Sequence, residues 1–284
     1  MKGKLRVGLG LLAALLVSSM AFSLGTRIFG RHRLRFPYLS RPIPVATYAA
    51  LAAKPGWSKA ELGVAPGITL RGLVRRPSSN GKPWVLFYPG NDESQLERGQ
   101  GFLIRLAGDR DLGLAVFGYR GYDASDGKSE LSGMRDDAPQ ILAQLCQKEG
   151  LEPGRVHLAG FSIGGYFAVQ AARGAAERGA RARTLTLLAS VDDIVMYQPS
   201  RFAKLSAGED YQTRGFLSGV PAPVLVLQGS ADEALEGPGQ GRAIAAALGD
   251  RAKYLELEGV KHVALLENAT ALEAVREFLK QHAP

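Results

Sequence analysis

The stretch Val156-His157-Leu158-Ala159-Gly160-Phe161-Ser162-Ile163-Gly164-Gly165-Tyr166 decides the fold of this chain. An apolar run ends in the pattern G-x-S-x-G, and an alanine-rich segment of helical composition follows it directly. A strand, a sharp turn and a helix in this order form a nucleophile elbow, which exposes a serine hydroxyl at the end of the strand. The glycines two residues before and after Ser162 remove Cβ atoms that would clash in such a turn. Ser162 is therefore the candidate nucleophile. A chance match between common residues is the alternative that the rest of the chain has to exclude.

The remaining sequence alternates short apolar runs with helical segments. The other runs expected to form strands are residues 68–75, 84–88, 114–117, 184–189, 223–228 and 254–257. Helical patterns occupy residues 94–107, 138–148, 239–248 and 269–282, with Pro139 near the first turn of its helix. This alternation predicts an α/β fold in which helices cover both faces of a mainly parallel sheet. Residues 192–220 interrupt the pattern with Tyr197, Phe202, Tyr211 and Phe216, which predicts a small lid insert.

The net charge of +8 arises at the N-terminus. Eight of the 35 cations lie in residues 1–41, which contain no acid, so the other 27 cations equal the 27 acids of the rest of the chain. The basic pI therefore does not indicate a nucleic-acid-binding face on the globular part. It suits contact between the N-terminus and an anionic membrane surface.

Residues 7–25 carry no charge, and a helix of these 19 residues would nearly span a bilayer core of about 30 Å. An uncleaved signal anchor is favoured over a cleaved signal peptide, because the apolar run is long. We expect a single-pass attachment with the domain on the extracytoplasmic side, although cations at both ends of the run leave its orientation open. The predicted division is a membrane segment or signal peptide over residues 1–25, a basic connector over 26–60, and a globular domain over 61–284.

A serine hydroxyl needs a base, and the base needs an acid that orients it. Of the four histidines, His262 follows a predicted strand at the carboxyl edge of the sheet, where α/β proteins place their ligands. His32 precedes the globular domain, His282 is close to the chain end, and His157 is interpreted as a packed strand residue. His262 is the candidate base.

The acid is expected between the serine and the histidine in sequence and on the same edge of the sheet. Asp232 is favoured, because it lies in a short glycine-containing turn directly after a predicted strand. Asp193 follows the preceding strand and is the main rival, and Glu233 is a weaker candidate. A turn residue or helix cap is the structural alternative for each.

Acyl transfer also needs N–H donors for the oxyanion that develops on the substrate. The backbone N–H of Ile163, the residue after the nucleophile, is the first candidate donor. The second is expected from the loop after residues 84–88, where we choose the N–H of Asn91, with Gly90 as the second choice.

Together these features resemble the α/β-hydrolase superfamily over residues 61–282. The elbow, the order Ser162, Asp232, His262, and the acid turn Gly229-Ser230-Ala231-Asp232 carry the resemblance. Residues 119–130, YRGYDASDGKSE, are similar to the stretch Y-R-G-Y-G-x-S-x-G-x-P-S-E of a membrane-anchored subgroup of serine hydrolases with a small lid.

Two departures from the family pattern concern the shape of the acyl pocket. The family's usual His-Gly is Pro89-Gly90 in this chain, and Asp123 stands where glycine is common. The resemblance implies a serine hydrolase that cleaves carboxylic esters or related acyl compounds through a Ser-His-Asp triad and an acyl-enzyme. Esterase, lipase or thioesterase activity is favoured over peptidase activity.

Two alternatives stay open. A peptidase would need recognition of a free amine or a proline, for which Glu209 and Asp210 are acidic candidates. A catalytically silent, membrane-tethered binding module would have no need of an intact triad. No metal-ligand cluster is apparent, and the single cysteine, Cys146, allows no intrachain disulfide. We therefore expect no metal or cofactor and no nucleic-acid partner, only an acyl substrate and the membrane.

Overall fold

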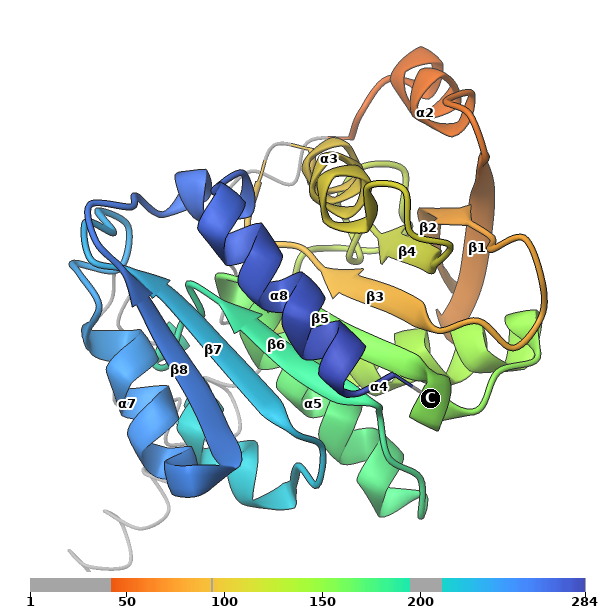
Figure 1. Cartoon of the computed structure of the whole chain (residues 1–284). Coiled ribbons are helices and arrows are strands. Elements are labelled where there is room, and N and C mark those ends of the chain that lie inside the picture. Colours follow the sequence, from red (N-terminus) through yellow and green to blue (C-terminus); the bar gives the residue numbers. More distant parts are fainter. Residues whose placement is uncertain (1–41, 93, 195–210, 284) are drawn as a thin grey trace, which may run out of the picture.

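The computed structural model describes residues 42–92, 94–194 and 211–283, which form an eight-stranded sheet flanked by helices (Figure 1). The strands are β1 (Trp57–Ala65), β2 (Ile68–Arg75), β3 (Trp84–Tyr88), β4 (Gly113–Phe117), β5 (Val156–Phe161), β6 (Thr184–Leu188), β7 (Val224–Gly229) and β8 (Ala252–Leu257). The helices are α2 (Val45–Ala52), α3 (Gln95–Ala107), α4 (Leu131–Glu149), α5 (Ile163–Glu177), α7 (Gly239–Leu248) and α8 (Ala269–Gln281).

The sheet has the strand order β1-β2-β4-β3-β5-β6-β7-β8. The first two strands run antiparallel to their neighbours, and all pairings from β4 through β3 to β8 are parallel. The prediction of a mainly parallel α/β sheet is confirmed. Because parallel strands share one carboxyl edge, the loops that follow β3, β5, β6, β7 and β8 meet on the same side of the molecule.

Helices cover both faces of the sheet. Figure 1 shows α3 and α8 on one face and α4 and α5 on the other. Every residue of β3, β4, β5, β6 and β7 is buried, as expected for strands covered on both faces. On the first face, Phe102 of α3 packs against Phe87 of β3 with ring centroids 4.7 Å apart.

The globular domain starts earlier than the predicted boundary at residue 61. Strand β1 begins at Trp57, whose side chain is buried, because the strand pairs along its length with β2. Helix α2 also packs on the domain, since the Tyr48 hydroxyl donates to the carbonyl of Gly72 over 2.9 Å. The second half of the predicted connector therefore belongs to the fold.

Helix α4 corrects the prediction of a helix over residues 138–148 with Pro139 near its first turn. The helix begins at Leu131, so Pro139 lies inside it. An interior proline removes one backbone donor and disfavours a helix on its own. Here the ring packs against α5 at Gly174, where an added Cβ would lie 2.4 Å from the Pro139 Cβ. Tertiary packing thus sustains a helix that local sequence signals do not predict.

Several predicted features lie outside the described residues. They are the apolar segment 7–25, residues 26–41 with His32, and residues 195–210 of the insert with Tyr197 and Phe202. Within the described ranges, no helix combines the length and the apolar character needed to cross a membrane. The described end of the insert is a 3₁₀ segment, Thr213–Gly219. Tyr211 is fully buried beside Tyr166, with ring centroids 6.2 Å apart, so this aromatic residue fastens the insert to the domain.

Candidate active site

The elbow has the strained backbone that the G-x-S-x-G pattern predicts. Strand β5 ends at Phe161, helix α5 begins at Ile163, and Ser162 between them has φ 54° and ψ −124°. A non-glycine residue in such a conformation costs on the order of 1–3 kcal/mol and persists only where its surroundings impose it. Here the Ser162 N–H donates to Leu188 over 2.9 Å, and its carbonyl accepts from Val191 over 3.1 Å.

Two glycines permit this turn because other backbone atoms occupy the space of a side chain. A Cβ at Gly160 would lie 2.4 Å from the carbonyl oxygen of Gly164. A Cβ at Gly164 would lie 2.0 Å from the carbonyl oxygen of Tyr88, at the end of β3. The spacing of the two glycines around the serine is therefore a steric requirement of the elbow, as predicted from the G-x-S-x-G pattern.

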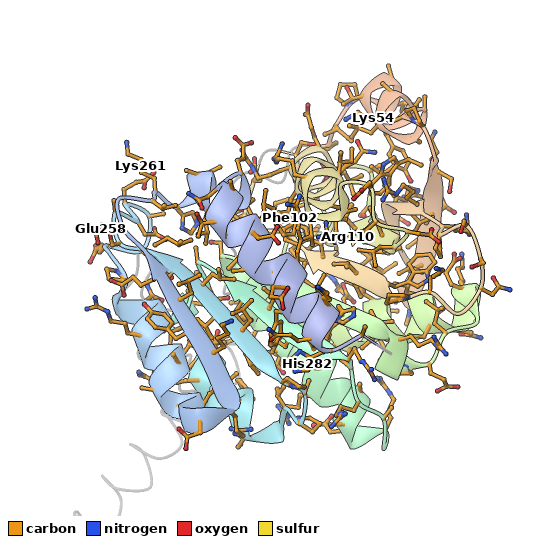
Figure 2. The ribbon with its side chains drawn as sticks, viewed as in Figure 1. Lys54, Phe102, Arg110, Glu258, Lys261 and His282 are labelled. Atoms are coloured by element: carbon orange, nitrogen blue, oxygen red, sulfur yellow. The ribbon has the colours of Figure 1, made fainter. Side chains whose placement is uncertain are left out.

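The structure brings His262 and Asp232 together. His262 Nδ1 and Asp232 Oδ2 are 2.8 Å apart, and both residues are buried. They come from the loops after β8 and β7, the last two strands of the sheet. Lys261 and Glu258, in the loop that holds His262, lie at the end of the molecule where β7 and β8 finish (Figure 2). The aspartate therefore has the position of an acid that fixes the ring orientation of the base.

Asp232 accepts hydrogen bonds at both oxygens. Oδ1 accepts from the backbone N–H groups of Ala234 and Leu235 over 3.1 and 2.9 Å. Oδ2 accepts from the side-chain amide of Gln228 over 2.7 Å, in addition to the histidine. Gln228 was not identified from the sequence. The sequence feature that could have identified it is its position as a polar residue at the end of the otherwise apolar run 223–228.

The other acidic candidates have different surroundings. Asp193 forms an isolated antiparallel bridge with Gln212, and its backbone N–H donates to the side chain of Gln240. Glu233 accepts a hydrogen bond from the backbone N–H of His262 over 3.2 Å, so it contacts the main chain of the candidate base rather than its ring. Of the three, Asp232 is the one whose carboxylate contacts the imidazole.

The imidazole lies beside the elbow. The rings of His262 and Phe161, the residue before the serine, have centroids 4.7 Å apart. Within the described residues, no hydrogen bond joins the Ser162 hydroxyl to His262. Catalytic hydrogen bonds are often long in unliganded enzymes and tighten when substrate binds.

The loop after β3 also lies against the serine. A Cβ at Gly90 would be 3.3 Å from the Ser162 Cβ. Two tyrosines of the stretch 119–130 donate hydrogen bonds to the residues that flank this glycine. Tyr119 donates to the carbonyl of Pro89 over 2.9 Å, and Tyr122 donates to Asn91 Oδ1 over 2.8 Å.

Both phenols remain protonated donors, because burial raises the pKa of Tyr119 and of Tyr122 well above 10.0. Residues 119–130, which carry the subgroup resemblance, therefore hold the loop after β3 in place through two hydrogen bonds. This loop contains Asn91, the predicted second oxyanion donor. The assignment of the N–H groups of Ile163 and Asn91 as the oxyanion donors stays a prediction.

Asp123, the departure from the family glycine, adopts the φ of 50° that a glycine would adopt without strain. Its Oδ2 accepts from the N–H of Leu96 in the first turn of α3 over 3.0 Å, whereas its Oδ1 has no partner among the described residues. Burial raises the pKa of this carboxyl to about 6. Asp123 thus contacts the first turn of α3, whose N-cap is Ser94.

The remaining described histidines lie away from the elbow. His157 is buried at the start of β5, its Nδ1 is 2.8 Å from Thr184 Oγ1, and burial lowers its pKa to about 4, which confirms it as a packing residue. His282 contacts the carbonyl of Phe278 through Nδ1. The described part of the chain contains no group of three or more His, Cys, Asp or Glu residues placed to hold a metal ion.

Comparison with known proteins starts from sequence. The chain is 31% identical over 227 residues to the uncharacterized protein Rv2307c of Mycobacterium tuberculosis, covering 76% of this chain and 77% of that protein. It is 26% identical over 184 residues to the uncharacterized peptidase YtmA of Bacillus subtilis, covering 59% of this chain and 70% of YtmA. No family model matches the sequence.

Solved structures share the fold. An alpha-beta hydrolase from Vibrio vulnificus superposes with a TM-score of 0.67 at 21% identity, over 85% of this chain and 86% of its own. The esterase PF2001 of Pyrococcus furiosus gives a TM-score of 0.67 at 17% identity, over 87% of this chain and 98% of the esterase. The chain therefore has the α/β-hydrolase fold. A puromycin-hydrolyzing peptidase of Mycobacterium tuberculosis has the same core, with a TM-score of 0.58 at 19% identity, over 80% of this chain and 39% of that one.

Proposed function

We propose that this protein is a serine hydrolase of the α/β-hydrolase superfamily and that it cleaves carboxylic esters or related acyl compounds. The observation that carries the proposal is the His262–Asp232 pair, 2.8 Å apart and buried beside an elbow whose serine is held in a strained conformation. In this arrangement a weak nucleophile, a base and an orienting acid occupy one edge of the sheet.

The reaction proceeds in two halves. His262 Nε2 takes the proton of Ser162 as the serine oxygen attacks the acyl carbon, and the substrate carbonyl becomes an oxyanion. The intermediate collapses to an acyl-enzyme, and His262 returns the proton to the leaving alcohol. A water molecule, activated by the same imidazole, then releases the acid and regenerates the serine. Asp232 keeps Nδ1 protonated, so that Nε2 is free to accept.

The oxyanion would be held by the N–H groups of Ile163 and Asn91. Such donors are effective when they are rigid before the substrate arrives, and loss of one donor typically costs about 10²–10³ in kcat. The hydrogen bonds of Tyr119 and Tyr122 on both sides of Gly90 support this role for the loop.

A peptidase that uses the same residues is the second candidate, because two similar proteins, YtmA and the puromycin-hydrolyzing enzyme, are described as peptidases. An amide differs from an ester chiefly in its poorer leaving group, so the same residues would act. The two functions are separated by kcat/KM for p-nitrophenyl butyrate against aminoacyl p-nitroanilides. Higher values for the anilides would replace the esterase proposal.

A fluorophosphonate probe tests the nucleophile directly. We expect wild type to be labelled, Ser162→Ala to be unlabelled, and the control Ser58→Ala, in β1 away from the elbow, to be labelled like wild type. Loss of the serine leaves only about 10³–10⁴ over the uncatalysed rate, from the oxyanion donors and binding. Equal labelling of Ser162→Ala and wild type would disprove the assignment. Failure of wild type to react would favour a catalytically silent binding module.

We also propose that residues 7–25 attach the protein to a membrane. The support is the uncharged run itself and the eight cations of residues 1–41 that surround it. A hydrolase held at a membrane meets acyl compounds at a raised local concentration.

A further inference from the structure

We propose that Gln228 is a positioning residue for the Asp232–His262 pair, one that holds the carboxylate in place and limits how strongly it attracts the imidazole proton. The inference rests on the proposed function, in which His262 is the base. It adds a fourth side chain to the serine, histidine and aspartate of the mechanism.

The geometry places two donors on one carboxylate oxygen. Asp232 Oδ2 accepts from Gln228 Nε2 over 2.7 Å and lies 2.8 Å from His262 Nδ1. The other oxygen is taken by the backbone N–H groups of Ala234 and Leu235. The carboxylate is thus held on all sides, and only one of its contacts is to the residue it is expected to orient.

The glutamine itself is costly to keep at this position. It is fully buried at the end of β7, and its Oε1 has no hydrogen-bond partner among the described residues. A buried polar atom without a partner destabilises the folded state. Helix α7 leaves room for the amide, since a Cβ at Gly241 would lie 2.9 Å from that oxygen. A side chain that adds an unpaired atom to the core yet donates to Asp232 is best explained by that donation.

The second donor has a predictable electrostatic effect. A hydrogen bond to a carboxylate stabilises its charge and weakens it as an acceptor for another donor. Without Gln228, Asp232 would hold the proton on His262 more tightly, and the pKa of the imidazole would rise. The other charged groups near the ring are Glu233, which accepts from the backbone N–H of His262, and Lys261 next to it in sequence. Neither changes in the variants below.

The test compares Gln228→Met and Gln228→Glu with the control Gln100→Met. Gln100 is also a fully buried glutamine with one bonded amide N–H, to the carbonyl of Leu51, and an Oε1 without a described partner. It lies in α3, outside the catalytic machinery. The pKa of His262 is measured by NMR titration of its ring, assigned by loss of the signal in His262→Gln. The dependence of kcat/KM on pH for p-nitrophenyl butyrate is the second readout.

For Gln228→Met we expect the pKa of His262 to rise by about 0.5–1, and kcat to fall roughly tenfold with little change in KM. For Gln228→Glu the new carboxyl is buried beside Asp232 and stays protonated, because two adjacent buried carboxyls do not both ionise. It can then donate to Oδ2 as the amide does, so both readouts should stay close to the wild-type values. Gln100→Met should leave both readouts at the wild-type values.

An unchanged pKa in Gln228→Met would overturn the proposal. So would an equal rise in Gln100→Met, which would indicate a general effect of core glutamines. The NMR titration needs no substrate. If wild type hydrolyses no acyl compound, the proposed function fails while the role of Gln228 is still tested.

Discussion

Replacing Asp232 by asparagine exchanges one carboxylate oxygen for an NH₂ group. This change should turn Nδ1 of His262 from a hydrogen-bond donor into an acceptor. If the asparagine oxygen keeps the two backbone N–H donors of Ala234 and Leu235, its NH₂ group takes the position of Oδ2. That NH₂ group would then face two other donors, the side-chain amide of Gln228 and the Nδ1–H of His262. In the wild type these two nitrogens lie 2.7 and 2.8 Å from Asp232 Oδ2.

Both conflicts have a structural solution. Gln228 can turn its amide over, so that its Oε1, without a partner among the described residues, accepts from the asparagine. His262 can move its proton from Nδ1 to Nε2 and accept at Nδ1. The fold then loses a charge-assisted hydrogen bond, which contributes about 1.5–3 kcal/mol to stability. The base, however, has its proton on the nitrogen that must accept one from Ser162.

We therefore expect kcat to fall about 10⁴-fold, equivalent to about 5.5 kcal/mol of transition-state stabilisation. The melting temperature should fall only several degrees, since about 1 kcal/mol corresponds to roughly 2–4 °C in a protein of this size. The assays are ester hydrolysis at saturating substrate and thermal unfolding followed by circular dichroism.

Asp193→Asn is the matched control, and its kcat should stay within a few fold of wild type. The reasoning is refuted if Asp232→Asn keeps more than about a tenth of the wild-type kcat. It is also refuted if the Asp193 variant is the more damaged of the two, because the acid would then lie after β6.

Two further predictions concern stability and location. Burial raises the pKa of Asp123 from 3.8 to about 6, so the folded protein binds this proton more tightly than the unfolded chain. The contribution of this group to stability should therefore fall by up to about 3 kcal/mol as pH rises from about 4 to 6 and stay level above that range. Asp123→Asn should lack this slope in urea unfolding at pH 4.5 and 7.5, and an unchanged slope would contradict the assignment. Deleting residues 1–25 should release an active domain from carbonate-washed membranes, and a wild-type protein already absent from membranes would exclude the anchor.

Much of this fold could be predicted because its strands carry strong local signals. The run Trp84–Tyr88 is apolar throughout and ends at Pro89-Gly90, so its boundaries agree with β3. The elbow also depends on short-range contacts. A side chain at Gly160 would clash with the backbone of Gly164, and a side chain at Gly164 would clash with the end of the neighbouring strand β3. The predicted boundaries were wrong where packing on another element decides where a helix or strand begins. Examples are α4, which contains Pro139, and β1, which begins at Trp57.

The choice among acids shows the limit of the sequence. Asp193 and Asp232 both follow buried strands with a similar local pattern, and β6 and β7 are neighbours in the sheet. Only the tertiary structure decides which carboxylate contacts His262, because that depends on how the loop after β8 returns over β7. The turns after β7 and β8 are joined by a hydrogen bond from the Ala231 N–H to the carbonyl of Val260.

The sequence by itself determined the fold class, the strand that ends at Ser162, and the order of serine, aspartate and histidine. These depend on spacing along the chain, which sterics and hydrophobic periodicity constrain. The tertiary structure alone decided the hydrogen bond of Gln228 to Asp232 and the bracing of Gly90 by Tyr119 and Tyr122. Such contacts join side chains from separate loops, and their geometry follows from strand register and helix packing rather than from any local pattern.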